Sequence, residues 1–163
     1  SVRIKPEIIH YKVILYSTFL ITIRSSLMKK EIVEVKGFEM PTLPDGKPVV
    51  PISMATKAGG FIYVSGTPPI NRETGKFELL DIKNQTRVSI ENIKFILETA
   101  DSCLKNILKL TIYCSNSGYF TEVNDVYREY FNKEAPARTF VTVGSWMMPF
   151  DLEIECIAIE NSN

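Results

Sequence analysis

The sequence predicts an α/β (α+β) fold in which a mixed sheet carries two helices on one of its faces. Two amphipathic helical patterns are separated by a short apolar strand pattern, and two more strand patterns close the chain. Each half of the chain therefore has a strand–helix–strand order, which favours helices packed on a common face. The length of 163 residues is enough for one domain that buries about 68–70% of its unfolded surface.

The N-terminal segment, residues 1–30, differs from the rest of the chain. Residues 13–23 form an apolar run between Lys12 and Arg24, too short for a bilayer core, which takes about 20 residues. Basic residues before the run resemble a secretory signal peptide, but no small-residue cleavage site follows it. An added strand, a cryptic targeting peptide and an upstream extension that ends before Met28 all remain open, and the β-branched content favours the strand.

Residues 31–163 are expected to form the single domain. The alternating pattern of residues 31–36 predicts a first strand. Residues 37–51 contain four prolines and an Asp-Gly pair, which predicts a loop with a turn. Residues 61–65 form a short apolar run between glycines and predict a second strand, followed by a proline-containing loop over residues 67–76.

The two helices and the remaining strands follow in order. Asp81 suits the N-cap of a helix that runs to about Ala100 with one apolar face. Residues 107–114 predict a third strand, and a second amphipathic helix ends before Pro136. The chain closes with strands predicted at residues 139–143 and 152–159.

The last predicted strand has two different faces. Every second residue from Leu152 to Ala158 is apolar and is expected to lie under the helices. The opposite face begins with Glu153 and ends with isoleucines, and the exposed sequence Trp-Met-Met precedes the strand. Because exposed apolar surface of this kind usually marks an interface, we expect an oligomer with Glu153 close to the contact. The alternative is that the N-terminal segment covers this face.

The composition excludes several classes of function. Nineteen basic side chains balance nineteen acidic ones, whereas a nucleic-acid-binding surface normally has a basic excess. The only histidine, His10, lies outside the expected domain, so a Ser–His–Asp triad and a multi-histidine metal site are not expected. No CxxC pair occurs among the three cysteines, Cys103, Cys114 and Cys156. They are typical of reduced thiols in a cytoplasmic protein, and no metal, cofactor or membrane partner is expected.

A few residues are candidates for chemistry. Arg138 could bind a carboxylate through two parallel hydrogen bonds, although a structural ion pair is the more common role of such a residue. Glu153 could be a general base or acid whose pKa is raised by burial, or an ordinary exposed carboxylate. Ser65 and Gly66 end a strand and could contact a ligand or only form a turn. Asn124 could orient Arg138 or a substrate, or face solvent.

Two blocks near the C-terminus favour the functional roles of these candidate residues. Residues 136–143 read P-A-R-T-F-V-T-V and residues 152–158 read L-E-I-E-C-I-A. Together they closely resemble the signature of the Rid family, also called YjgF or endoribonuclease L-PSP. Blocks around Ser65-Gly66 and Gln85, and around Asn124, fit the same family in order. The resemblance covers about residues 48–160 and leaves out residues 1–30.

The resemblance implies a chorismate-mutase-like fold and a barrel-like homotrimer with ligand clefts between subunits. It also implies hydrolysis of reactive 2-imino or 2-enamino acids to 2-oxo acids and ammonia, without metal or organic cofactor. By position, Arg138 matches the arginine that holds the substrate carboxylate, and Glu153 matches the glutamate associated with water activation. Ser65 and Gly66 match residues that line the cleft, and Asn124 matches the family's helix asparagine.

Two departures from the family pattern concern the cleft. Ile52 stands where the imine deaminases carry a tyrosine, and Phe140 stands where that subgroup often has cysteine. Both changes predict a more apolar substrate site. The blocks at residues 65–67 and 85–93 are similar to the 2-aminomuconate deaminase branch, which acts on a longer dicarboxylic enamine. A non-catalytic trimer that binds carboxylate metabolites is a further alternative, and a ribonuclease or translation inhibitor fits the neutral charge less well.

Overall fold

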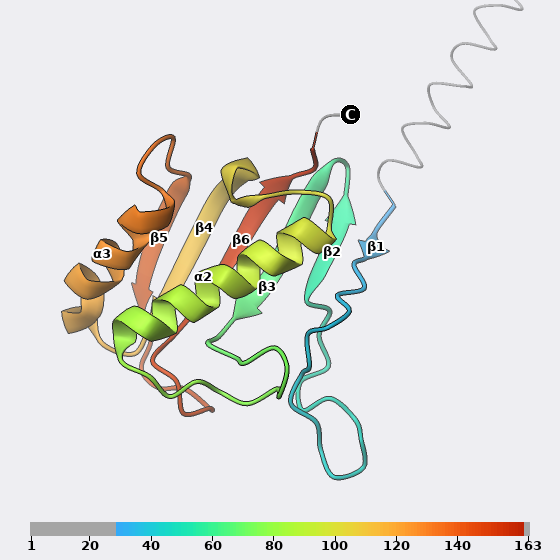
Figure 1. The fold of residues 1–163 in the computed structure, drawn as a ribbon, viewed down its shortest axis with the longest axis horizontal. Coiled ribbons are helices and arrows are strands. Elements are labelled where there is room, and N and C mark those ends of the chain that lie inside the picture. Colours follow the sequence, from blue (N-terminus) through green and yellow to red (C-terminus); the bar gives the residue numbers. More distant parts are fainter. Residues whose placement is uncertain (1–28, 162–163) are drawn as a thin grey trace, which may run out of the picture.

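The computed structural model describes residues 29–161, so the apolar run at residues 13–23 lies outside the described residues. The domain is one six-stranded sheet with strand order β1-β2-β3-β6-β4-β5 and two helices packed on one face (Figure 1). The elements in chain order are β1 (Glu31–Ile32), β2 (Ala55–Ala58), β3 (Phe61–Thr67), α2 (Ile82–Thr99), β4 (Ile107–Cys114), α3 (Phe120–Tyr130), β5 (Ala137–Thr142) and β6 (Leu152–Ile159).

The strand directions explain the mixed sheet. The last strand, β6, lies between β3 and β4 and is antiparallel to both of them. β4 and β5 run parallel and are joined by α3, as a crossover connection requires. The predicted α/β class, with two helices on one face of a mixed sheet, is confirmed.

The first strand is shorter than predicted, and strand β2 was not predicted at all. The prediction of a strand over residues 31–36 is wrong beyond Ile32, because Gly37 turns the chain at a φ of 77° and Phe38 becomes buried. β2 has the sequence Ala-Thr-Lys-Ala, which lacks the bulky β-branched residues that mark a strand. Its position is explained by the two-residue turn after it.

That turn is Gly59-Gly60, which joins β2 to β3 as an antiparallel hairpin. Both glycines have positive φ values, 62° and 81°, the backbone that a tight two-residue hairpin turn requires and that side chains disfavour. From the sequence, these glycines were predicted only to bound the next strand. A pair of glycines before an apolar strand also predicts a hairpin, and this information was available in the sequence.

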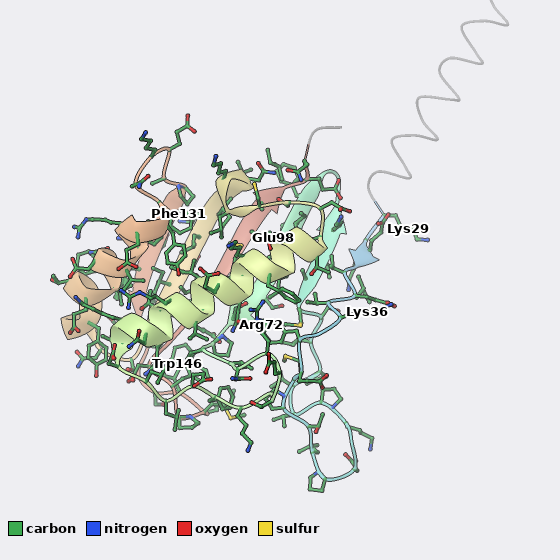
Figure 2. The ribbon with its side chains drawn as sticks, viewed as in Figure 1. Lys29, Lys36, Arg72, Glu98, Phe131 and Trp146 are labelled. Atoms are coloured by element: carbon green, nitrogen blue, oxygen red, sulfur yellow. The ribbon has the colours of Figure 1, made fainter. Side chains whose placement is uncertain are left out.

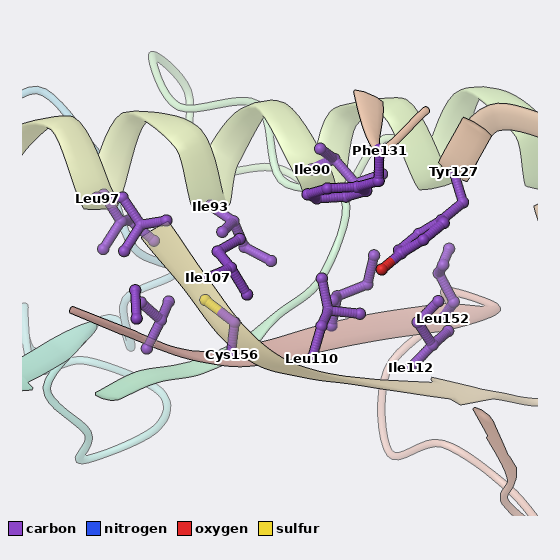
Figure 3. Packing of buried hydrophobic residues seen from close by; sticks show 14 of the residues in the cluster. Ile90, Ile93, Leu97, Ile107, Leu110, Ile112, Tyr127, Phe131, Leu152 and Cys156 are labelled. Carbon is purple, nitrogen blue, oxygen red and sulfur yellow. The ribbon is translucent and has the colours of Figure 1, made fainter. Parts of the chain in front are cut away.

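The core lies between the helices and the sheet. Asp81 caps α2 as predicted, since its side chain accepts a hydrogen bond of 3.0 Å from the backbone N–H of Asn84. The apolar faces of α2 and α3 pack on the strands, as Figure 3 shows for Ile90, Ile93 and Leu97 above the sheet. Leu152, Ile154, Cys156 and Ala158 of β6 are all buried on this side, as their spacing predicted.

Candidate functional site

A cavity of about 360 Å³ opens at the end of the sheet where the connecting loops meet. It brings together four of the seven candidate residues, namely Ile52, Ser65, Gly66 and Glu153. The β5–β6 connection forms part of the wall, and Figure 2 labels its Trp146. All three of Trp146, Met147 and Met148 line the cavity. Met147 is 96% exposed as predicted, whereas Trp146, whose ring packs on Phe150, and Met148 are only partly exposed.

Ser65 and Gly66 form an irregularity in β3. The register between β3 and β6 pairs Val64 with Cys156 and then Thr67 with Ile154, so two residues of β3 face one residue of β6. A bulge of this kind bends a strand and redirects its side chains. The Ser65 hydroxyl donates a hydrogen bond of 2.8 Å to the carbonyl of Ser53. The hydroxyl therefore ties the strand to the loop that carries Ile52, and its oxygen remains able to accept a hydrogen bond.

Gly66 is required by the close approach of Glu153. A Cβ atom added at Gly66 would lie 2.9 Å from Cδ and 3.0 Å from both carboxylate oxygens of Glu153. The φ of Gly66 is not in the left-handed region, so the requirement is one of space and not of backbone conformation. The absence of a side chain at position 66 therefore lets the carboxylate lie against the backbone of β3.

Glu153 has an unusual electrostatic environment for a strand carboxylate. It is half-buried, and burial raises its pKa above the ordinary value, with a smaller contribution from the negative charge of Glu155. Glu155 itself accepts a hydrogen bond of 3.0 Å from the hydroxyl of Tyr113. Among residues 29–161, the cavity wall contains no lysine, arginine or histidine to neutralise the carboxylate. Glu153 is thus suited to accept a proton.

Arg138 lies elsewhere in the single chain. It belongs to β5 itself, which begins at Ala137 and not after Arg138 as predicted. Its guanidinium carbon stacks 4.5 Å from the centre of the Tyr127 ring and 5.9 Å from that of Phe120. These cation–π contacts hold the half-buried side chain on the outer strand of the sheet.

The register shows that Arg138 and Glu153 point to opposite faces. Arg138 pairs with Leu110, which is buried under the helices, while Glu153 pairs with Tyr113 on the open face. Side chains of directly paired residues share a face of the sheet. The structure therefore does not place these two residues in one cavity of the same chain.

The other two candidates also lie outside this cavity. Phe140 is half-buried on β5 and packs edge-to-face on Phe120, with ring centres 5.2 Å apart. Asn124 is half-buried on α3 and does not line the cavity. Arg138, Phe140 and Asn124 thus belong to the β5–α3 edge, and the remaining four candidates belong to the cavity.

A partly buried polar network that was not predicted from the sequence fixes the start of β6. The Gln85 side-chain amide donates to the Asp151 carboxylate at 2.8 Å, and the Asp151 N–H donates to the Gln85 side-chain oxygen at 2.9 Å. The Ser115 hydroxyl donates to the same carboxylate at 2.9 Å. These bonds fix α2 and the end of β4 to the residue before β6, two positions from Glu153. A glutamine on the buried face of a helix was the available signal, because buried polar groups need partners.

Two further observations concern metal binding and membrane crossing. Within residues 29–161, no three histidine, cysteine, aspartate or glutamate side chains gather in a way that could hold a metal ion. None of the helices in this part of the chain is long and apolar enough to cross a membrane.

The fold and the cavity define a class of small α+β proteins with a ligand-sized cavity beside an open sheet face. Residues 44–160 match the model of the family described as Endoribonuclease L-PSP. This match spans more than half of the chain, and the chain belongs to that family, which includes the YjgF and RutC proteins.

Relatives and solved structures agree with this placement. A RutC family protein of Pyrococcus horikoshii is 44% identical over 112 residues, which cover 69% of this chain and 89% of the relative. A putative endoribonuclease of Thermotoga maritima superposes with a TM-score of 0.72 at 35% identity, over 83% of this chain and all of that one. Escherichia coli TdcF, solved with bound serine, superposes with a TM-score of 0.70 at 27% identity, over 80% of this chain and 99% of that one. The suspected family is confirmed.

Proposed function

We propose that the protein is a hydrolytic deaminase that converts reactive 2-imino or 2-enamino acids to 2-oxo acids and ammonia. The observation that carries this proposal is the Glu153 carboxylate, half-buried in an apolar cavity and held against Gly66. A carboxylate with a raised pKa and no cationic partner in the cavity wall is suited to take a proton from water.

The proposed reaction needs only a positioned water molecule and a group that transfers protons. Glu153 accepts a proton from a water molecule whose oxygen forms a bond to the C=N carbon, and it passes this proton to the nitrogen as the C=N double bond becomes a single bond. Glu153 then takes the hydroxyl proton of the resulting carbinolamine and delivers it to the amino group, so that the C–N bond breaks, ammonia leaves and the C=O bond of the 2-oxo acid forms. An enamine first gains a proton at C3 and loses one from its nitrogen, which gives the imine. Since the C=N carbon is already electrophilic, positioning and proton transfer account for the catalysis.

Arg138 is proposed to bind the substrate carboxylate in the cavity of a neighbouring copy. It lies on β5, the outer strand of the sheet, whereas Glu153 points to the opposite face and lines the cavity at the end of the sheet. A second copy that packs its β5 edge against this cavity would complete the site, with Phe140 and Asn124 at the same edge. We propose a homotrimer with three such clefts. A bidentate guanidinium–carboxylate contact is worth about 1.5–3 kcal/mol.

The known ligand of one relative supports this assignment. TdcF was solved with bound serine, and serine shares a carboxylate and an α-nitrogen with the proposed substrates. The balanced charge of this chain gives no comparable support to an RNA substrate, because phosphate contacts need cations.

The test is the release of ammonia from imines that an amino-acid oxidase generates in the same vessel. We expect the wild-type protein to accelerate hydrolysis, and Glu153→Gln to lower kcat by about 10²–10⁴-fold, the usual contribution of a general base. Arg138→Ala should mainly weaken substrate binding. No acceleration by the wild type would contradict the proposal. Ligand binding without turnover would identify a non-catalytic binder, and salt-dependent RNA degradation would identify a ribonuclease.

A further inference from the structure

We infer that the cavity selects monocarboxylic 2-imino acids with large apolar side chains and rejects dicarboxylic ones. This inference rests on the proposed function and specifies its substrate class. It follows from the walls of the cavity, in which Glu153 is the only charged residue among the described residues that line it. Most of the remaining lining is apolar or aromatic, including Phe38, Ile70, Phe77, Trp146 and Phe150.

The cavity of one chain, before the β5 edge of a neighbouring copy packs against it, is larger than the smallest substrates need. A cavity of about 360 Å³ has room for many water molecules, each of which takes about 30 Å³ in the liquid. The imine from alanine or serine would leave most of this space to water in contact with apolar walls. A branched or aromatic side chain would displace that water, and each added buried methylene improves transition-state binding roughly four-fold.

The methionines that line the cavity indicate that it can accept substrate side chains of different shapes. Met40, Met54, Met147 and Met148, four of the five methionines in the sequence, line this one cavity. Methionine side chains are flexible and polarisable, so they adapt to apolar groups of different outline. We therefore expect similar rates for leucine-, methionine- and phenylalanine-derived imines.

A second carboxylate on the substrate would have no partner. Arg138 of the neighbouring copy is assigned to the carboxylate next to the C=N group, and the described cavity wall offers no other cation. The additional carboxylate would lie in an apolar environment that already holds Glu153. Burial of an unpaired charge is costly. We therefore do not expect a dicarboxylic substrate like that of the 2-aminomuconate deaminases, although the sequence blocks at residues 65–67 and 85–93 are similar to that branch.

The test compares imines generated from alanine, leucine, phenylalanine and glutamate, each measured as acceleration over spontaneous hydrolysis. We expect kcat/KM for the leucine and phenylalanine imines to exceed that for the alanine imine by roughly 10- to 100-fold. The glutamate imine, similar in length to the leucine imine, should fall at least about ten-fold below it because of its second charge.

A variant with an added cation sharpens the test. Ile52 lines the cavity and is 49% exposed, so arginine fits there without entering the core. Ile52→Arg should lower the leucine-to-glutamate ratio of kcat/KM. Leu79→Arg introduces the same charge at an exposed position away from the cavity, and should leave the ratio as it is.

The two proposals fail in different ways. Equal acceleration of the alanine, leucine and glutamate imines, or an unchanged ratio in Ile52→Arg, would overturn the inferred selectivity and leave the deaminase function standing. No acceleration of any imine would overturn both proposals.

Discussion

The two faces of strand β6 differ in almost every respect, although their residues alternate along the same eight positions. On one face Leu152, Ile154 and Ala158 are completely buried under the helices. On the other face Glu153 and Glu155 are half-buried carboxylates beside the cavity, with Glu155 bonded to Tyr113. The comparison teaches that the helix-covered face stabilises the domain and that the open face is available for chemistry and assembly.

Substitutions on adjacent positions of β6 should separate these two roles. Ile154→Ala removes a fully buried side chain from the core and should lower the free energy of unfolding by about 2–5 kcal/mol. The kcat of the protein that remains folded should change little. Chemical denaturation at a fixed protein concentration measures the first effect, and an imine hydrolysis assay measures the second.

Glu153→Gln is the matched variant on the other face of β6. It should lower kcat strongly and leave the stability of the fold unchanged or higher. The pKa of Glu153 is raised in the folded protein, so the unfolded chain releases this proton at a lower pH than the folded one. Stability therefore decreases as the pH rises from the unfolded pKa to the folded pKa, and the loss is complete once the pH exceeds the folded pKa. Glutamine removes that cost, so the melting temperature at pH 7 should equal or exceed that of the wild type. A clear loss of stability would show that Glu153 has a structural role.

A smaller effect is expected from a single methyl group on the open face. Gly66→Ala places Cβ against the Glu153 carboxylate and should displace it, which lowers kcat by about 10- to 100-fold as misplaced catalytic groups do. Gly144→Ala is the control, because a Cβ there meets no atom within 4 Å. Equal activity of the two variants would contradict the positioning of Glu153 by Gly66.

The smallest expected effect is a shift in the pH profile. If Glu153 is the base, kcat/KM falls as the pH decreases through its pKa, which lies above the ordinary 4.5. Glu155→Gln removes the negative charge that contributes to this increase and keeps an acceptor for Tyr113. The acidic limb of the profile should therefore move to lower pH. A limb that stays in place would show that Glu155 does not influence the reactive group.

The sequence predicted the helices and β6 well because their patterns are strong. The apolar spacing of α2 and the cap at Asp81 are local signals, and the alternation of β6 identified both of its faces. β2 was missed because its four residues are small or polar and its pairing depends on the glycine turn that follows.

The site was predictable only in part. The resemblance to the family pointed to Glu153, Ser65, Gly66 and Ile52, and the structure brings these four residues to one cavity. It could not show that Arg138 lies on the opposite face of the sheet, because that depends on the register between β4 and β5. The bond between Gln85 and Asp151 joins residues 66 positions apart. The buried helix position of Gln85 indicated that its amide needs a partner, but no local pattern identifies Asp151 as that partner.

The central claim is that Arg138 of one copy and Glu153 of another form a single active site. The most direct measurement mixes Arg138→Ala protein with Glu153→Gln protein under conditions that allow subunits to exchange. The substrate concentration is kept far below the KM of the Arg138→Ala protein, so that each variant alone has little activity. Random assembly of a ring-shaped oligomer should restore an intact pair in about one quarter of the clefts, and activity should recover to about that fraction of the wild type. If mass measurement shows mixed oligomers and activity stays at the level of the separate variants, the two residues do not act in a shared cleft.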